Sequence, residues 1–373
     1  MEKPISELRR DLVSGDWVVI ATGRAKRPHE FLKQKKDLFR QPKRTCPFEK
    51  LLTDSLVLYS LDRETGKENG LTGASTEFSR MSSPQVGSTG ISNELNRTSL
   101  LSRVKSKNWW AEVIPNKYPA FGSGICDLSH RVGPYEWTEG VGAHEVVITR
   151  DHERSIGEMS DDEAELVIRA YQERYLALRK IECIRYISIF HNHGRRAGAT
   201  LSHPHSQIIA LPVTPPDFTR SFHGSERFFE GHNKCIHCIE LEHELRVKDR
   251  LIYDNDQFAV LAPFASKTAF EMRIFPKKHN PHFESIDSPM RFAFANALRS
   301  ALGKLHKGLG NPDYNFFLHT APVADSKNYH HYHWHFEILP KTAIWAGFEI
   351  GTGIEISTIA PETAAEFLRR IRV

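Results

Sequence analysis

One stretch of the sequence determines how the rest is interpreted: His191-Asn-His-Gly-Arg-Arg-Ala-Gly-Ala-Thr-Leu-Ser-His-Pro-His-Ser-Gln-Ile-Ile-Ala210. An apolar run, Tyr186–Phe190, leads into it, and the chain is expected to return as a strand after the glycines. Alternate side chains of a strand share one face, so His203, His205 and Gln207 are predicted to point the same way. Two imidazoles and an amide beside a glycine-rich loop suit chemistry on a phosphate. A surface strand with incidental histidines is the alternative.

The chain repeats one order of motifs twice. Each half contains a Cys-x-x-(Glu/Cys) pair, a strand ending in a lone histidine, a capped helix, a tyrosine-led strand and an H-x-H strand. The corresponding residues are Cys46/Glu49 and Cys235/Cys238, His152 and His279, Tyr186 and Tyr314, and His203/His205 and His333/His335. We interpret this pattern as a duplication. The proline-rich segment 211–217 is the candidate boundary, which gives an N-terminal half of residues 1–213 and a C-terminal half of residues 214–373.

Strands and helices are expected from the spacing of apolar residues. The expected strands are Asp16–Ala21, Trp109–Ile114, His144–Thr149, Tyr186–Phe190, Phe258–Ala262, Phe270–Phe275, Tyr314–His319 and His331–Leu339. A helix over Ser160–Lys180 should begin with a capping box of Ser160 and Glu163, and a second should begin at the N-cap Ser288, before Pro289. Residues 66–98, rich in Ser, Thr, Gly and Asn, are interpreted as a flexible insertion.

Composition excludes some classes of protein. Of the 373 residues, 40% are apolar and 26% charged, and the formal net charge of +4 comes from scattered Lys and Arg, which does not favour nucleic-acid binding. No apolar stretch approaches the roughly 18 residues of a membrane helix. Met1–Val13 is charged and lacks the apolar core of a signal peptide, so we expect a cytoplasmic protein.

Cysteines and histidines form two candidate metal sites. Cys235, Cys238, His279 and His333 are a Cys2His2 set, which suits tetrahedral zinc with a structural role. The matching set in the first half is Cys46, Glu49, His152 and His203, where a carboxylate replaces a thiolate. Free thiols and exposed histidines are the alternative.

If His203 binds a metal, His205 is the free imidazole on that face. A neutral imidazole is a good nucleophile toward an activated phosphoryl group, so His205 is predicted to carry a nucleotide covalently. Gln207 would bind a phosphate oxygen without taking part in proton transfer. The loop Gly194–Thr200 is expected to supply backbone N–H donors and a hydroxyl.

These motifs together resemble the galactose-1-phosphate uridylyltransferase branch of the histidine triad superfamily, over nearly the whole chain. The resemblance rests on H-P-H-S-Q (203–207) after N-x-G-x-x-x-G (192–198), on R-A-K-R-P (24–28) and on a second H-x-H-F (333–336). It implies an α+β fold of two histidine-triad-like halves, each an antiparallel sheet with helices packed on it. It also implies a homodimer whose active sites are completed across the interface, and a ping-pong reaction. In that reaction His205 takes UMP from UDP-glucose and passes it to a hexose 1-phosphate, and Gln207 steadies the adduct.

The resemblance also implies further site residues. Arg24, Arg27, Asn116, Asn192, Gly198 and Thr200 match nucleotide- and phosphate-binding positions, and Phe348 and Glu349 match sugar-binding positions. The family implies one or two zinc ions per subunit, and the second metal could be iron. The partners it implies are a nucleoside-diphosphate sugar and a hexose 1-phosphate, without nucleic acid or membrane.

Three departures leave alternatives open. Glu49 replaces a zinc cysteine, Lys117 stands where the best-known enterobacterial type is acidic, and the segment after Glu349 lacks that type's glutamine. The run Gly347–Gly353 also resembles the plant-type ADP-glucose phosphorylase. The rival functions are therefore an ADP-glucose phosphorylase or adenylyltransferase, a dinucleoside polyphosphate phosphorylase, and a zinc-stabilised nucleotide-binding module without catalysis. In the second half, His335 with Glu337 resembles a site that has lost its activity.

Overall fold

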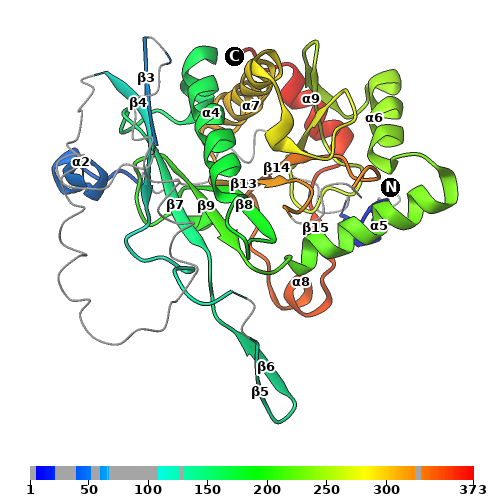
Figure 1. Ribbon diagram of the computed structural model, residues 1–373. Helices are drawn as coiled ribbons and strands as arrows, with labels where there is room; N and C mark the ends of the chain where they lie inside the picture. Colours follow the sequence, from blue (N-terminus) through cyan, green and yellow to red (C-terminus); the bar gives the residue numbers. More distant parts are fainter. Residues whose placement is uncertain are drawn as a thin grey trace, which may run out of the picture.

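The computed structural model describes residues 6–21, 39–51, 59–64, 66, 108–126, 129–323 and 329–373. Arg24 and Arg27 lie outside these ranges, as does the expected insertion at 66–98 apart from Gly66. A ten-stranded sheet runs through the molecule (Figure 1).

Every pair of neighbouring strands in this sheet is antiparallel, and the strand order is β10-β11-β12-β14-β13-β8-β9-β7-β4-β3. The strands are β3 (Tyr59–Asp62), β4 (Trp109–Pro115), β7 (Ala143–Thr149), β8 (Tyr186–His193), β9 (His205–Leu211), β10 (Leu251–Asp254), β11 (Phe258–Leu261), β12 (Met272–Pro276), β13 (Tyr314–His319) and β14 (His335–Pro340). The order in one half mirrors the order in the other about the β8–β13 junction. The α+β fold of antiparallel strands with packed helices is confirmed.

Two long helices, α4 (Asp161–Leu178) and α7 (Ser288–Leu309), lie side by side on one face of the sheet (Figure 1). Helix α4 begins at the predicted capping box, in which the Ser160 hydroxyl accepts the Glu163 N–H. The cap of α7 is Asp287, whose carboxylate accepts the Met290 N–H at 2.9 Å. The predicted N-cap, Ser288, is therefore wrong by one residue, because the carboxylate before it reaches the free N–H group.

The remaining elements surround the sheet. The other helices are α2 (Pro47–Leu51), α5 (Pro216–His232), α6 (Ile236–Val247), α8 (Gly347–Thr352) and α9 (Pro361–Arg369), with 3₁₀ turns η2 (Lys43–Thr45), η4 (Ile156–Glu158), η5 (Arg195–Ala197) and η6 (Phe283–Ser285). A three-stranded sheet joins β1 (Glu7–Arg10), β2 (Trp17–Ile20) and β15 (Glu355–Ser357), and β5 (Ser129–Val132) with β6 (Tyr135–Thr138) forms a projecting hairpin (Figure 1). None of the described helices combines the length and apolar composition that a membrane crossing requires.

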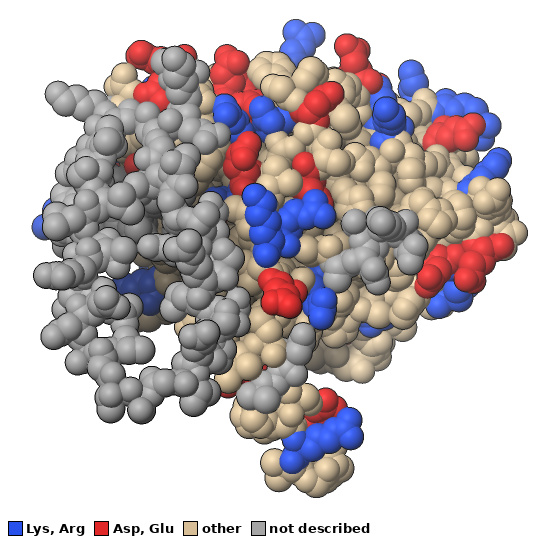
Figure 2. Space-filling model, viewed as in Figure 1, with Lys and Arg blue, Asp and Glu red and all other residues tan. Residues whose placement is uncertain are grey.

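The N-terminal strands lie with the second half of the chain. Strand β2 pairs with β15, and Asp11 forms an ion pair of 3.1 Å with Arg273 on β12. The division at residue 213 separates the strands of the large sheet but leaves β1 and β2 with the later residues. On the face shown in Figure 2, the described basic and acidic side chains are interspersed.

The register at the β8–β13 junction relates the two halves by a local two-fold rotation. Phe190 pairs with Phe317 across the junction. Gln207 pairs with Phe190 on the outer side of β8, and Glu337 pairs with Phe317 on the outer side of β13. The rotation therefore superposes Gln207 on Glu337 and, two residues earlier, His205 on His335.

The tyrosines that were predicted to correspond do not. The two-fold rotation about the Phe190–Phe317 pair places Tyr314, three residues before Phe317, on Ile187, three residues before Phe190, and not on Tyr186. Tyr186 packs with Phe218 and Tyr332, whereas Tyr314 belongs to the main core. The prediction is wrong by one residue, and a shift of one residue in a strand moves a side chain to the opposite face.

Two further details differ from the expectations. The strand expected from Phe270 begins at Met272, because Phe270 has a φ of 67° in the turn closed by the Glu271 N–H and the Thr268 carbonyl. Cys126 and Cys183 form a disulfide with a Cα–Cα distance of 5.4 Å. That pairing carries no signal in the sequence, because the residues are 57 positions apart.

Gly157 offers a test of how η4 packs against α7. A Cβ at this position would lie 2.7 Å from Gly303 N and from the Leu302 carbonyl carbon. We expect Gly157→Ala to lower the free energy of unfolding by about 1–3 kcal/mol, because backbone atoms cannot move aside easily. In α5, a Cβ at Gly231 meets nothing within 4 Å, so Gly231→Ala is the matched control and should not destabilise. Equal midpoints for the two variants in urea unfolding would contradict this packing.

Candidate functional site

His205, the first residue of β9, has one ring nitrogen committed and one available. Its Nδ1 lies 2.8 Å from the carbonyl oxygen of His203, and a carbonyl can only accept, so Nδ1 carries the proton. The lone pair is then on Nε2. Burial lowers the pKa of His205, which keeps the ring neutral. The geometry suits a nucleophile.

The neighbours of His205 fix the strand that carries it. The Phe48 ring packs against the imidazole with centroids 5.1 Å apart. The next residue, Ser206, points to the other face, where its hydroxyl lies 2.5 Å from the Tyr171 hydroxyl and 3.0 Å from His191 Nδ1. These contacts hold β9 against both α4 and β8.

The side-chain amides of Gln207 and Asn192 lie on the same sheet face as His205. The Gln207 Oε1 is 2.8 Å from His144 Nε2, and Asn116 Nδ2 is 3.1 Å from that same nitrogen. The Asn192 Oδ1 accepts a hydrogen bond of 2.7 Å from Asn315 Nδ2. The structure therefore places Asn116 beside Gln207, and it brings Asn192 onto the face of β8 that lies next to His205.

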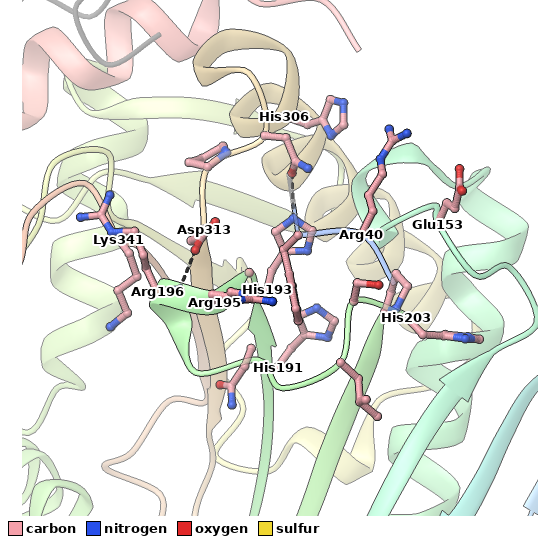
Figure 3. A pocket seen from close by; sticks show the side chains of 18 of the residues that line it. Arg40, Glu153, His191, His193, Arg195, Arg196, His203, His306, Asp313 and Lys341 are labelled. Atoms are coloured by element: carbon pink, nitrogen blue, oxygen red, sulfur yellow. Dashed lines mark hydrogen bonds between the residues drawn. The ribbon is translucent and has the colours of Figure 1, made fainter. Parts of the chain in front are cut away.

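The loop between β8 and β9 is held by the second half of the chain (Figure 3). Asp313 accepts the Arg196 N–H at 2.7 Å and lies so close to Gly194 that a Cβ there would be 2.2 Å from the carboxylate carbon. Gly194 has a φ of 83°, which favours glycine. The N–H groups of residues 197–199 donate to the carbonyls of Gly194 and Arg195. The expectation that this loop offers free backbone donors is therefore wrong for residues 196–199.

A cavity of about 400 Å³ lies behind this loop (Figure 3). Its walls come from the ends of β8 and α7, from η5 and from residues after β14, and include His193, His306 and Lys341. Asn192 and His203 also line it, but His205 and Gln207 do not. The cavity therefore meets the face of His205 at Asn192, although His205 itself does not line it.

The other predicted site residues lie at the surface. Gly198 has a φ of 91°, and Thr200 is exposed at the end of the loop. On α8, Phe348 is exposed and Glu349 is partly buried, and the Glu349 carboxylate accepts the Ala346 N–H at 2.9 Å. The described contacts of α8 do not bring these two side chains to His205.

Two residues of the site, His144 and Asn315, were not predicted. Each reaches its amide partner from another strand, so the contact depends on register. The only signal in the sequence is a polar side chain on the period-two face of an otherwise apolar strand.

The first predicted metal set is brought together around two imidazoles. The His152 and His203 Nε2 atoms each lie 2.7 Å from a backbone carbonyl, so both Nδ1 atoms carry lone pairs, and these are only 3.1 Å apart. Glu49 Oε1 is 3.2 Å from His152 Nδ1, and Cys46 Sγ is 3.6 Å from His203 Nδ1. Lone pairs that face one another beside a carboxylate and a thiol fit a cation.

The second predicted set is also assembled. The ligand atoms of Cys235, Cys238, His279 and His333 lie within 4.8 Å of one another. The His279 Nε2 donates to the His330 carbonyl at 2.9 Å, which leaves Nδ1 facing Cys238 at 3.3 Å. A hydrogen bond from Cys238 lowers the pKa of the Cys235 thiol, which favours the thiolate. This donor set fits tetrahedral zinc.

In the second half, the position that corresponds to His205 is His335, and an ion pair lies beside it. His335 Nδ1 donates to the His333 carbonyl at 3.1 Å, as in the first half. Its Nε2, however, lies 3.8 Å from the Glu337 carboxylate, which forms an ion pair of 2.8 Å with Arg273. Although burial raises it, the charge of Arg273 holds the pKa of Glu337 well below its usual range. A carboxylate there repels a phosphate, so His335 is not expected to carry a nucleotide.

The metal sets predict a stability effect. Protein purified without chelator should contain about one or two zinc ions per chain by elemental analysis. Cys235→Ala should lose about one equivalent and lower the melting temperature, since metal binding is part of the folding free energy. His243→Ala, an exposed histidine on the adjacent α6, should change neither quantity. Equal zinc content in both variants would remove Cys235 from the ligand set.

Comparison with known proteins gives consistent matches. The family model for the N-terminal domain of galactose-1-phosphate uridyl transferase matches residues 102–215. An ADP-glucose phosphorylase of Arabidopsis thaliana is 31% identical over 100% of this chain and 94% of its own length. A galactose-1-phosphate uridylyltransferase of Thermotoga maritima is 29% identical over 69% of this chain and 83% of its own length.

Two solved structures resemble the fold described above. The crystal structure of an ADP-glucose phosphorylase from Arabidopsis thaliana with bound ADP-glucose has a TM-score of 0.73 and 26% identity, and the match covers 99% of this chain and 100% of that chain. A uridylyltransferase structure has a TM-score of 0.66 and 25% identity, over 84% of this chain and 98% of that chain.

Proposed function

This chain belongs to the galactose-1-phosphate uridylyltransferase family, and we propose that it moves a nucleoside monophosphate from a nucleoside-diphosphate hexose to a phosphate-bearing acceptor through His205. The relatives are uridylyltransferases and an ADP-glucose phosphorylase, so the chain is a nucleotidyltransferase, and the non-catalytic binding module is set aside. The observation that carries the proposal is the imidazole of His205, with Nδ1–H bonded to a carbonyl and Nε2 left with its lone pair.

In the first step, His205 Nε2 attacks the α-phosphorus of the donor. A nitrogen–phosphorus bond forms while the bond from the α-phosphorus to the bridging oxygen breaks, and hexose 1-phosphate leaves with that oxygen. No proton has to move, because Nδ1 keeps its hydrogen bond to the His203 carbonyl as the ring becomes positive.

In the second step, an acceptor phosphate oxygen attacks the same phosphorus and displaces the imidazole. The amides of Asn192 and Gln207 are placed to bind non-bridging oxygens in both steps, since both lie on the face of His205. The predicted contacts of Arg24, Arg27, Asn116, Gly198 and Thr200 with the nucleotide remain part of the proposal. Zinc, or iron at the second set, would hold the ligand strands and supplies no step.

The substrates are the finer part of the proposal. The resemblance of the motifs favours UDP-glucose with a hexose 1-phosphate as acceptor. The match to the Arabidopsis ADP-glucose phosphorylase covers the whole chain, whereas the matches to the galactose-1-phosphate uridylyltransferases cover 50–69% of it. We therefore put ADP-glucose first as donor, with UDP-glucose as the second candidate.

A second copy of the chain is the proposed partner at α8. This helix and the residues before it expose Ile344, Trp345, Phe348 and Ile350, of which Ile344 and Ile350 are more than 70% accessible. Phe348 and Glu349 do not reach the His205 of their own chain within the described contacts. They would complete the site of the other subunit, in keeping with the homodimer that the family resemblance implies.

The cytoplasm remains the proposed compartment. Cys46, Cys235 and Cys238 are free cysteines, and as metal ligands they need to stay reduced. The Cys126–Cys183 disulfide, in contrast, is of a kind more common in oxidising compartments.

The covalent intermediate can be trapped directly. Incubation with ADP-, UDP- and GDP-glucose, each without acceptor, should give a nucleotide adduct by intact mass with one donor, and peptide mapping should place it on His205 and not on His335. His205→Ala should lower turnover by about 10⁴-fold or more, because the nucleophile is lost. His223→Ala, exposed on α5, should retain activity and the adduct. An adduct that persists in His205→Ala would refute the assignment.

Subunit mixing tests the role of α8. His205→Ala and the double variant Phe348→Ala/Glu349→Ala should each have little activity. Exchange of subunits between them should restore about a quarter of the wild-type value, since half of the dimers are mixed and each mixed dimer has one complete site. Two differently tagged His205→Ala preparations should restore nothing. A monomer in sedimentation, or no recovery on mixing, would contradict the shared site.

A further inference from the structure

We propose that His144 and Asn315 act as positioning residues that orient the amides of Gln207 and Asn192, so that both NH2 groups face the phosphate at His205. The inference rests on the proposed function and extends it to two residues outside the H-P-H-S-Q motif. Each orientation follows from a backbone group whose role as donor or acceptor is fixed.

The orientation of Asn192 follows from the Ala197 carbonyl. Asn315 Nδ2 lies 2.8 Å from that carbonyl oxygen and 2.7 Å from Asn192 Oδ1. A carbonyl only accepts, so the Asn315 atom facing it is the NH2 group. The same NH2 donates to Asn192 Oδ1, which leaves the NH2 group of Asn192 for another acceptor.

The orientation of Gln207 follows from the Ala120 N–H. This group donates to His144 Nδ1 at 3.2 Å, so that nitrogen has a lone pair and the proton is on Nε2. His144 Nε2–H then donates to Gln207 Oε1 at 2.8 Å. Asn116 does not compete for this proton: its Oδ1 accepts the Tyr118 N–H at 2.9 Å, so the group that faces His144 Nε2 at 3.1 Å is the Asn116 NH2, which can only donate and makes no hydrogen bond with the Nε2–H. The NH2 group of Gln207 is left for another acceptor.

The two free NH2 groups lie on the face of the sheet that carries His205. Gln207 pairs with Phe190, and Asn192 lies two residues further along β8, next to the position of His205. The N–H groups of loop residues 196–199 are already used, so a phosphate at His205 depends on side-chain donors such as these two amides. An amide turned the other way would present its carbonyl oxygen to the phosphate and repel it.

The two halves of the chain share this task. His144 is on β7 of the first half, whereas Asn315 is on β13 of the second. The second half therefore contributes to the reaction through Asn315, although its own site is closed by Glu337 and Arg273.

Two replacements of His144 test whether its hydrogen-bond donor orients the Gln207 amide. His144→Gln keeps a donor toward Gln207 Oε1, whereas His144→Glu has nearly the same shape and can only accept. We expect the single-turnover rate of adduct formation to stay within about tenfold of wild type in His144→Gln and to fall by about 10²–10³-fold in His144→Glu. The KM for the nucleotide sugar should change less than kcat, since the amide acts mainly in the transition state.

Replacement of Asn315 tests the other amide. Asn315→Asp cannot donate to Asn192 Oδ1 or to the Ala197 carbonyl, and we expect a loss of similar size. Asn311→Asp is the matched control: its Oδ1 lies 2.8 Å from His193 Nε2, and a carboxylate keeps that acceptor, so adduct formation should not change. Melting temperatures identify any variant that does not fold. If the variants at one of the two positions, His144 or Asn315, do not fold, the variants at the other position test the inference.

Each outcome is decisive. Equal rates in His144→Gln and His144→Glu would overturn the inference, because the glutamate removes the donor and adds a negative charge, and neither change would then affect the reaction. The same holds for equal rates in Asn315→Asp and Asn311→Asp. If wild type forms no adduct with any nucleotide sugar, the proposed function itself fails, and the inference fails with it.

Discussion

One hydrogen bond governs the site, the bond from His205 Nδ1 to the backbone carbonyl of His203. The ring of His203 is itself fixed, because its Nε2 donates to the Thr149 carbonyl and its Nδ1 faces Cys46 and His152. One residue therefore connects the first metal set to the nucleophile. A metal there can hold the position and tautomer of His205 while it takes no part in the reaction. Nitrogen–phosphorus bond formation requires that constraint, since an imidazole free to rotate would present the wrong nitrogen as often as the right one.

The same hydrogen bond occurs in the second half, where we expect no covalent intermediate, so the bond alone is not sufficient. His335 Nδ1 donates to His333, and burial lowers the pKa of His335 to about 3. What differs is the residue two positions later. Glu337 brings a negative charge where Gln207 brings an amide, and Arg273 neutralises it. Arg273 also binds Asp11, so the face proposed to bind a phosphate in one half holds the N-terminal segment in the other.

Most of the fold and about half of the site could be predicted from the sequence. The features that were predictable depend on residues close together in the chain, and the others depend on residues far apart. The start of α4 was predictable because Ser160 and Glu163 are three residues apart and bond directly. The shared face of His205 and Gln207 followed from the period of a strand. Two other features depend on residues far apart in the chain. Nothing in the sequence indicated the Cys126–Cys183 disulfide, and the order of motifs led to a wrong match between Tyr186 and Tyr314. His144 and Asn315 belong to this second group, because only the register of β7 with β9 and of β13 with β8 shows which amide each one meets.

The duplicated sheet gives the second half a role in the proposed reaction even without a nucleophile of its own. Strand β8 has β9 on one side and β13 on the other, so the residues around the phosphate loop need a partner strand on both sides. Asp313 and Asn315 meet this need: Asp313 accepts the Arg196 N–H of the loop, and Asn315 fixes the Asn192 amide. A single half would leave that edge of β8 open to water, with the loop free to move. In the proposed reaction the second half therefore acts as the partner edge of β8, through Asp313 and Asn315, and its own histidine at position 335 takes no part.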